Sequence, residues 1–222
     1  MKYYIIAGEA SGDLHGSNLI KAIHQEDKEA NIRCWGGDLM EKAGANLVKH
    51  YRDLAFMGFA EVIMNLRTIL KNLKFCKEDI ETFKPDVVIL IDYPGFNLRI
   101  AEFVKSIGIK VYYYISPQVW AWKKNRVYKI KQTVDRMFVI LPFEKDFYKQ
   151  FEMDVDYVGH PLLDAIQKRD SSQERLQNLR KDLQLSEQKL VAILPGSRKQ
   201  EISKMLPIML KQSKELPDFQ FV

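Results

Sequence analysis

The sequence is poor in cysteine and has no long hydrophobic run. Its 222 residues include two cysteines, Cys34 and Cys76, which are too few for a disulfide framework and lack the paired spacing of a metal site, so a reducing compartment is favoured. No apolar run reaches the roughly 18 residues that a membrane-spanning helix needs. The apolar start, residues 1–6, is too short for a signal peptide. We therefore expect a cytoplasmic protein.

The sequence also has no strong excess of one charge. Lys and Arg total 34 and Asp and Glu total 29, a net charge of +5, which suits nucleic acid, anionic lipid or phosphorylated ligands equally well. The 46% hydrophobic and 28% charged residues are typical of a globular protein and exclude a disordered or collagenous one.

What the sequence does contain is an alternation of short apolar runs, rich in Val, Ile and Tyr, with longer amphipathic stretches. This alternation is typical of β-α units that form a parallel sheet covered on both faces. It predicts a doubly wound, Rossmann-like α/β domain over residues 1–165. We predict six strands in it, at residues 3–7, 32–35, 87–91, 111–115, 136–141 and 156–158.

A polar stretch follows this domain. Residues 166–188 are rich in Gln, Lys, Arg, Ser and Glu and predict a linker with one exposed helix. Residues 189–222 then predict the beginning of a second α/β domain, with strands at 190–194 and 219–222 and a helix at 201–216. Because one β-α-β unit cannot close a core, we expect this second domain to be incomplete.

The ligand crevice of a doubly wound sheet lies outside the carboxyl ends of its strands. After the first predicted strand, glycines recur at positions 8, 12 and 16. Such a segment can present amide N–H groups at a helix N-terminus to an anion or sugar. The alternative is close packing of the helix on its strand, with Ser11 as N-cap. A nicotinamide-dependent oxidoreductase, with Asp38 after the second strand, is the nearest rival enzyme, but the glycine spacing argues against it.

A carboxylate follows the most apolar predicted strand. Asp92 comes directly after residues 87–91 and before Pro94 and Gly95. A partly desolvated Asp has a raised pKa and can accept a proton from an alcohol, so Asp92 is a candidate general base. The alternative is a turn residue that hydrogen-bonds to its own backbone.

Tryptophans and cations alternate after the strand at 111–115. Trp120 and Trp122 lie within seven residues of three cations, at positions 123, 124 and 126. Such a cluster can stack on sugar or base faces or lie at a lipid headgroup boundary. It also supports a rival interpretation, a nucleic-acid-binding protein. No nucleic-acid motif is present, so we expect no nucleic-acid partner.

Two further segments lie where the chain passes between the predicted domains. His160, before Pro161, can face an interdomain cleft and titrate near neutral pH, or can be a hinge residue hydrogen-bonded to the backbone. The turn at 195–198 presents backbone amides, a hydroxyl and the Arg198 guanidinium to one point, which suits a diphosphate. Its alternative is a capped turn with Arg198 in solvent.

Residues 56–77 predict an amphipathic helix and the turn before it. Apolar residues fall at helical spacing at 62, 63, 66, 69, 70 and 73, beside the cations at 67, 71 and 74. This pattern suits an anionic membrane surface, although most apolar stripes are core faces. The candidate membrane residues are Phe56, Met57, Phe59, Ile63, Leu66, Arg67, Leu70, Lys71, Leu73 and Lys74.

Several uncommon segments occur together and in order between residue 3 and about residue 202. They are Gly8-Glu9-Ala10-Ser11-Gly12-Asp13, Met57-Gly58 with Glu61-Val62, Asp92-Tyr93-Pro94-Gly95-Phe96-Asn97, Ser116-Pro117-Gln118-Val119-Trp120-Ala121-Trp122, Leu141-Pro142-Phe143-Glu144, Gly159-His160-Pro161 and Leu194-Pro195-Gly196-Ser197-Arg198. This set resembles the lipid-A-disaccharide synthase family.

The resemblance implies a glycosyltransferase with two Rossmann-like domains, the GT-B fold. It further implies an inverting, metal-independent reaction, without a cofactor, that joins UDP-2,3-diacylglucosamine to 2,3-diacylglucosamine 1-phosphate and releases UDP. The implied location is peripheral, on the cytoplasmic face of a Gram-negative inner membrane. Because such enzymes hold the nucleotide in a complete second domain, we expect the 222-residue chain alone to turn over little. A non-catalytic acceptor-binding fragment is a further alternative.

The resemblance also implies roles for individual residues. Asp92 is expected to be the catalytic base. The substrate-binding residues are then Gly8, Glu9, Ser11, Gly12, Asn97, Ser116, Gln118, Trp120, Glu144 and His160. The UDP-binding residues are Pro195, Gly196, Ser197, Arg198 and Glu201.

Overall fold

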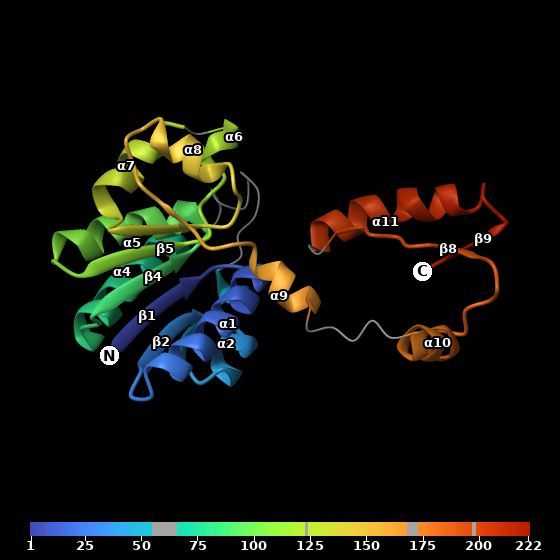
Figure 1. Ribbon diagram of the computed structural model, residues 1–222, viewed down its shortest axis with the longest axis horizontal. Helices are drawn as coiled ribbons and strands as arrows, with labels where there is room; N and C mark the ends of the chain where they lie inside the picture. The colour runs from blue at the N-terminus through green and yellow to red at the C-terminus, as the bar shows by residue number, and fades with distance from the viewer. Residues whose placement is uncertain (55–65, 123, 168–172, 197–198) are drawn as a thin grey trace. The chain divides into compact units, whose positions relative to one another are not determined.

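A computed structural model describes residues 1–54, 66–122, 124–167, 173–196 and 199–222. The chain divides into two compact units, residues 1–163 and 164–222, and both are drawn in Figure 1. They are called unit 1 and unit 2 below and are described separately.

Unit 1 is built on a parallel sheet whose described strands have the order β3-β2-β1-β4-β5-β6-β7. The doubly wound α/β prediction is confirmed. The strands are β1 Lys2–Ala7, β2 Asn31–Gly36, β3 Asn46–His50, β4 Val87–Ile91, β5 Lys110–Tyr114, β6 Arg136–Val139 and β7 Asp156–Tyr157. The prediction of six strands is wrong, because β3 was missed. β3 is an edge strand with one exposed and four partly buried residues, so it lacks a continuous apolar run.

Helices cover both faces of this sheet (Figure 1). Helices α1 and α2 lie on one face, and α4, α5, α7 and α8 contribute to the core on the other face. The helical elements of unit 1 are α1 Ala10–Glu26, α2 Asp38–Lys42, η1 Tyr51–Asp53, α4 Leu66–Phe83, α5 Pro94–Ser106, α6 Val119–Trp122, α7 Arg126–Thr133, α8 Glu144–Lys149 and α9 Pro161–Gln167, which ends in unit 2.

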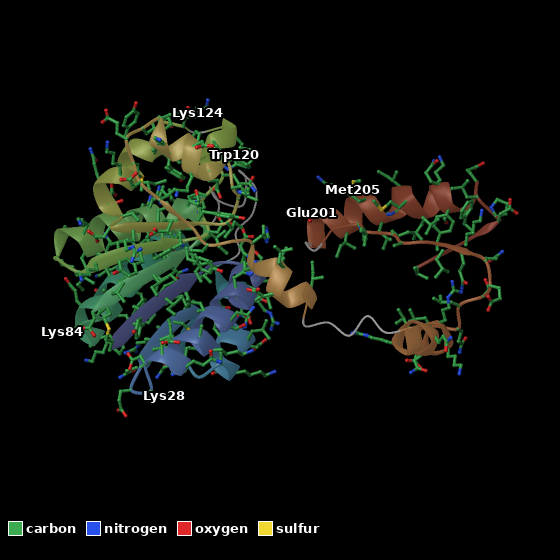
Figure 2. All side chains as sticks on the ribbon, viewed as in Figure 1. Lys28, Lys84, Trp120, Lys124, Glu201 and Met205 are labelled. Atoms are coloured by element: carbon green, nitrogen blue, oxygen red, sulfur yellow. The ribbon has the colours of Figure 1, made fainter. Side chains whose placement is uncertain are left out.

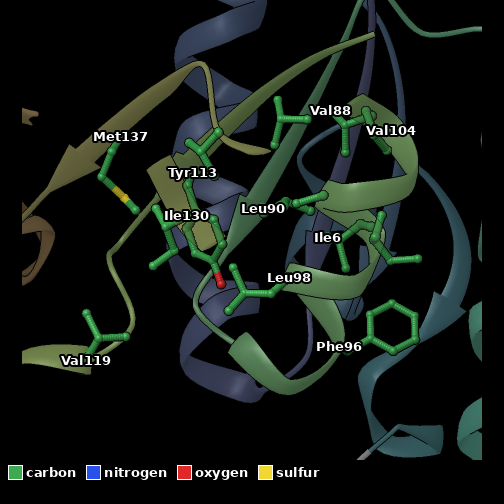
Figure 3. Packing of buried hydrophobic residues seen from close by; sticks show 14 of the residues in the cluster. Ile6, Val88, Leu90, Phe96, Leu98, Val104, Tyr113, Val119, Ile130 and Met137 are labelled. Carbon is green, nitrogen blue, oxygen red and sulfur yellow. The ribbon is translucent and has the colours of Figure 1, made fainter. Parts of the chain in front are cut away.

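The central strand β4 is apolar throughout because both of its faces are buried. Val88 and Leu90 pack into the core under α4 and α5, whereas Val87, Ile89 and Ile91 pack under α1 and α2. Figure 3 shows Val88 and Leu90 with Tyr113 and Leu98 in the first of these cores. Burying one such side chain stabilises the fold by about 1.5–3 kcal/mol.

A buried polar network fixes α4 to the sheet. The Asp79 carboxylate accepts a hydrogen bond from the Tyr4 hydroxyl at 2.7 Å and forms an ion pair with Arg33 at 2.9 Å. The Trp35 indole N–H donates to the Tyr4 oxygen at 2.8 Å. Because each polar atom of the Asp79 carboxylate has a partner, the helix can bury this charge against β1 and β2.

Unit 2 contains α10 Gln173–Asp182, β8 Lys189–Val191, α11 Lys199–Ser213 and β9 Phe219–Phe221. Strands β8 and β9 pair in parallel, with Leu190 opposite Gln220, so each predicted element of this part is present. None of the described side chains from residue 164 onward is buried. Among the described residues of both units, no helix combines the length and apolar character that crossing a bilayer requires.

Candidate functional site

The loops after β1 and β4 meet at the carboxyl edge of the sheet, where the strand order reverses direction and where ligands of such sheets bind. Gly8 lies against the ring of Tyr93, and a Cβ atom at this position would come within 2.4 Å of that ring. The Tyr93 hydroxyl donates to the Leu54 carbonyl oxygen at 3.2 Å. Tyr93 therefore joins three segments, and only glycine allows the close approach at residue 8.

Asp92 lies directly after β4 in a left-handed turn. Its φ is 43° and that of Tyr93 is 49°, a conformation that is uncommon for residues other than glycine. The Asn97 amide donates to the carbonyl oxygens of Ile91 and Asp92 at 3.2 and 2.8 Å, and the Tyr113 hydroxyl donates to the Asp92 carbonyl at 2.5 Å. Asn97 is fully buried beneath this turn, while Asp92 is half-buried.

The segment after β1 differs from the prediction in the residue that caps its helix. Helix α1 begins at Ala10 with Glu9 as N-cap, so the assignment of Ser11 as N-cap is wrong, and Ser11 is exposed in the first turn. The helix can begin this early because Gly12 packs on Ala7, where a Cβ would lie 3.0 Å from the Ala7 Cβ. The close-packing alternative is therefore confirmed for Gly12. Burial and the charge of Glu9 raise the pKa of Tyr93.

Sequence reasoning missed the role of Asp13. Its carboxylate is 3% exposed and accepts hydrogen bonds from the backbone N–H groups of Gly37 and Met40 at 2.8 and 3.0 Å. Asp13 thus satisfies the free N–H groups at the start of α2. Asp38, on which the oxidoreductase alternative depends, forms an exposed ion pair with Arg52 at 3.4 Å, and its carboxylate lies 3.6 Å from the His50 Nε2.

Ser116 and Glu144 lie close to one hydroxyl, that of Tyr148. The Ser116 Oγ is 2.7 Å from the Tyr148 oxygen, and the Glu144 carboxylate accepts N–H hydrogen bonds from Ile140 and Leu141 at 3.2 and 2.9 Å. Glu144 is 2% exposed, and burial raises its pKa, against the effect of those hydrogen bonds. The cluster therefore ties the loop after β5 to the loop after β6.

The Trp120 ring packs edge-on against Phe143, with ring centroids 5.0 Å apart. Its indole N–H is buried and has no hydrogen-bond partner among the described residues, and Gln118 beside it is exposed. Figure 2 shows Trp120 on the side of unit 1 to which the strands point, away from Lys28 and Lys84. Lys123 lies outside the described residues.

His160 is hydrogen-bonded to the backbone, as its hinge interpretation predicts. Its Nδ1 accepts the Leu162 N–H at 3.2 Å at the start of α9. His15, a residue that sequence reasoning missed, lies near it: burial and the charge of His160 lower the pKa of His15. His15 has no local motif around it, so no signal in the sequence connects it with residue 160.

In unit 2 the turn after β8 contains Gly196 in a left-handed conformation, with a φ of 104°. A Cβ at this position would lie 2.6 Å from a carboxylate oxygen of Glu201, which a flexible side chain can move away, so the φ is what favours glycine here. Pro195 is half-buried. Ser197 and Arg198, the other residues predicted to bind UDP, lie outside the described residues.

The predicted membrane helix is α4, and its apolar residues divide between core and surface. Leu73 is buried, whereas Leu66 and Leu70 are 50% and 54% exposed, and Phe75, which was not predicted, is 44% exposed. Arg67, Lys71 and Lys74 are exposed. Phe56, Met57, Phe59 and Ile63 lie outside the described residues. A hollow of about 400 Å³ adjoins α4, lined by Lys49, Lys71, Asn72, Lys74, Phe75 and Glu78.

A series of aromatic rings leads from this helix to the Asp92 turn. Phe75 and Trp35 have ring centroids 6.0 Å apart, Trp35 and Phe96 are 5.4 Å apart, and Phe96 and Tyr93 are 5.7 Å apart. The exposed part of α4 and the turn are therefore connected through packed side chains. In the described parts of the chain, no group of three or more His, Cys, Asp or Glu side chains is placed to hold a metal ion.

Comparison with known sequences shows one family. The family model described as lipid-A-disaccharide synthetase matches residues 3–220. The lipid-A-disaccharide synthase of Syntrophus aciditrophicus is 47% identical over 216 residues, which are 96% of this chain and 55% of that protein. That of Geobacter metallireducens is 44% identical, over 96% of this chain and 55% of that protein. The chain thus spans just over half the length of these curated relatives.

Comparison with solved structures shows the fold. UDP-GlcNAc 2-epimerase from Neisseria meningitidis, bound to UDP-GlcNAc, has a TM-score of 0.68 at 13% identity, over 100% of this chain and 65% of that one. The S. aureus MnaA–UDP co-structure has a TM-score of 0.65 at 13% identity, over 99% and 61% of the two chains. At such low identity the likeness extends to the fold alone.

Proposed function

The chain belongs to the lipid-A-disaccharide synthase family, and on this premise we propose that it takes part in an inverting, metal-independent hexosyl transfer. The donor in this proposal is UDP-2,3-diacylglucosamine, the acceptor is 2,3-diacylglucosamine 1-phosphate, and UDP is released. Family membership supports the glycosyl transfer. The fold is shared with proteins that were solved with UDP-GlcNAc or UDP, which supports a nucleotide sugar as donor.

Asp92 is the general base of the proposed reaction. As the acceptor 6-hydroxyl oxygen attacks the anomeric carbon of the donor, its proton passes to the Asp92 carboxylate. The bond from that carbon to the UDP oxygen breaks on the opposite face, so the configuration inverts and UDP leaves with the bonding electrons. The observation that carries this role is the position of Asp92, half-buried in a strained turn at the carboxyl edge of β4, because strained conformations are concentrated at active sites.

The other predicted residues have supporting roles in this proposal. In the loop after β1, Glu9 and the exposed Ser11 contact the acceptor beside Asp92, and the buried Gly8 and Gly12 allow the close packing that places this loop. The turn at Pro195, Gly196, Ser197 and Arg198, followed by Glu201, binds the UDP diphosphate, and Arg198 stabilises its developing charge where a metal would otherwise be needed. The support among the described residues is the left-handed Gly196, which opens the turn ahead of α11.

Asp92→Asn in the natural gene product that contains this chain tests the proposal. The substitution keeps the shape of the side chain but removes the base, so turnover should fall by about 10²–10⁴-fold while UDP binding stays unchanged. Asp86→Asn is the matched control, because Asp86 lies just before the same strand at its other end. Full turnover by the Asp92→Asn variant, measured with radiolabelled donor, would exclude the role of Asp92 as base.

The proposed location is peripheral, on the cytoplasmic face of the inner membrane, with α4 against the lipid. Both substrates carry acyl chains, and the exposed Leu66, Leu70 and Phe75 lie beside three exposed cations. Apolar side chains that enter the acyl boundary, together with cations near anionic headgroups, give such helices their affinity. The aromatic series from Phe75 to Tyr93 connects this surface with the acceptor site.

Co-sedimentation with vesicles that contain phosphatidylglycerol tests this surface. The triple variant Leu66→Ser, Leu70→Ser and Phe75→Ser should lose most of its binding. The control is Leu39→Ser, because Leu39 is 42% exposed on α2, which covers the other face of the sheet. Unchanged binding by the triple variant would show that these residues do not contact lipid.

A further inference from the structure

The carbonyl oxygen of Asp92 accepts hydrogen bonds from two buried side chains. The Tyr113 hydroxyl lies 2.5 Å from it and the Asn97 amide nitrogen 2.8 Å. Both donors are 0% exposed. They come from different elements, Tyr113 from β5 and Asn97 from the first turn of α5, so the carbonyl is held from the neighbouring strand and from its own helix.

These two hydrogen bonds hold a conformation that the backbone does not favour. Asp92 and Tyr93 are consecutive left-handed residues without the freedom of glycine, and such residues cost of order 1–3 kcal/mol each and persist only where the surroundings over-determine them. Tyr93 is fixed on its other side by Gly8 and by the Leu54 carbonyl. Neither contact acts on the Asp92 peptide group directly. The Asp92 N–H donates to the Tyr114 carbonyl oxygen at 3.4 Å, so the side chains of Tyr113 and Asn97 supply the shorter hydrogen bonds to this turn.

Tyr113 is suited to be a permanent donor. Its ring lies among Leu90, Leu98 and Ile130 in the core (Figure 3). Burial, followed by the negative charge of Asp92, raises its pKa well above the ordinary value. The hydroxyl therefore keeps its proton over the whole physiological range and donates to the Asp92 carbonyl in every protonation state of the site.

We infer that Tyr113, together with Asn97, is a positioning residue that holds the Asp92 backbone in its left-handed conformation and so sets the direction of the Asp92 carboxylate. Neither side chain touches substrate in this arrangement, so Asn97, which the resemblance placed among the substrate-binding residues, acts instead from beneath the turn, where it is 0% exposed. The inference rests on the proposed function of Asp92 as base. Without the two donors the turn can relax toward a right-handed conformation, which would rotate the carboxylate away from the acceptor hydroxyl.

Tyr113→Phe in the natural gene product tests this role. It removes one hydroxyl and leaves the ring, so kcat should fall by about 10–100-fold through misplacement of the base, with the KM values of both substrates within about twofold. A hydroxyl that serves only stability would leave kcat of the folded protein unchanged. Tyr112→Phe is the matched control on the same strand, because the Tyr112 ring packs on Phe138 instead, and its kcat should not change.

The outcomes separate this inference from the proposed function. If Asp92→Asn lowers turnover as expected and Tyr113→Phe keeps the kcat of the unsubstituted protein, the positioning role is overturned and the base assignment stands. If Asp92→Asn itself retains full turnover, the proposed function fails first. Should Tyr113→Phe not fold, as judged by circular dichroism, Asn97→Ser gives the second test, because serine keeps a donor but cannot reach both carbonyls. Unchanged kcat for that variant would again overturn the inference.

Discussion

Units 1 and 2 contain the same kinds of element but differ in how they bury apolar side chains. In unit 1 both sheet faces are covered, and Ile6, Trp35 and Tyr113 are 0% exposed. Among the described residues of unit 2 no side chain is buried, and Leu194 and Ile208 are 81% and 59% exposed. Helices and strands of similar sequence pattern are therefore stabilised to very different extents.

This contrast indicates that the buried core of unit 1 keeps its candidate site residues rigid. The donors that hold Asp92 lie inside that core, whereas the turn at Gly196 adjoins a two-stranded sheet, β8 and β9, under a single helix. Two strands alone are marginally stable in water. We expect substitutions in unit 1 to change the free energy of unfolding strongly and equivalent substitutions in unit 2 to change it little.

The largest effect on the free energy of unfolding is expected when the buried carboxylate of Asp79 is removed. Asp79→Ala should lower the free energy of unfolding of unit 1 by about 3–5 kcal/mol, because Arg33 and Tyr4 lose their shared partner inside the protein. Urea unfolding followed by tryptophan fluorescence measures this, since Trp35, Trp120 and Trp122 all lie in unit 1.

The control for Asp79→Ala is Asp218→Ala at an exposed position of unit 2. Exposed substitutions away from such networks change stability by within about 0.5 kcal/mol. Equal losses of unfolding free energy for the two variants would contradict the proposed difference in stability between the units.

Truncation of an apolar side chain should also cost more stability in unit 1 than in unit 2. Leu90→Ala removes a side chain that is 0% exposed and should cost about 2–5 kcal/mol through lost burial and the cavity left behind. Leu210→Ala, at a side chain that is 48% exposed on α11, should cost less than about 1 kcal/mol. Circular dichroism in urea detects both units. A Leu210→Ala cost as large as that of Leu90→Ala would mean that α11 is buried in solution.

A smaller, pH-dependent effect on stability is expected when Asp135 is substituted. Burial alone would raise its pKa, but hydrogen bonds from Lys105 and from the Val111 N–H, the latter at 2.8 Å, outweigh burial and hold the pKa below its ordinary value. A lowered carboxyl pKa contributes stability that is present above the ordinary pKa of about 3.9 and is lost as pH falls through the folded-state pKa.

Asp135→Asn should therefore destabilise unit 1 by about 1 kcal/mol at pH 7, and the difference should shrink as pH falls below about 4. Thermal unfolding across this pH range measures it. A cost that stayed constant down to pH 2 would show that the ionised carboxylate contributes nothing. Lys105→Met should remove part of the same pH-dependent stability, because Lys105 is one of the hydrogen-bond donors to Asp135.

The smallest effect concerns reactivity rather than stability. Cys34 and Cys76 are buried in unit 1, and burial raises the pKa of Cys34 to about 12 and that of Cys76 further. Because the thiolate is the reactive form, both should react with a disulfide reagent at pH 8 only after unfolding. A cysteine introduced as Gln212→Cys on α11, an exposed position, should react at once. Prompt labelling of Cys34 or Cys76 in the native protein would show that the core of unit 1 opens.

Local patterns were sufficient to predict most strands and the loops that follow them. The run at 87–91 was recognised because five consecutive apolar residues, all buried, are typical of a strand covered on both faces. The strand at Asn46–His50 was missed, because an edge strand with partly buried and polar residues resembles a loop. Ser11 was misplaced as N-cap because the sequence does not show that Gly12 lets the helix start beside Ala7.

For the candidate site, local sequence was sufficient to predict which residue follows each strand, since order along the chain and apolar periodicity are local properties. Asp92, Ser116 and Gly8 were selected as candidate residues in this way. Their surroundings follow from the fold and not from local sequence: Tyr113 is 21 residues from Asp92 and Tyr148 is 32 residues from Ser116. Parallel strands join their neighbours through helical crossovers, so the partners that hold a turn come from distant segments, and no local pattern encodes which of them will meet.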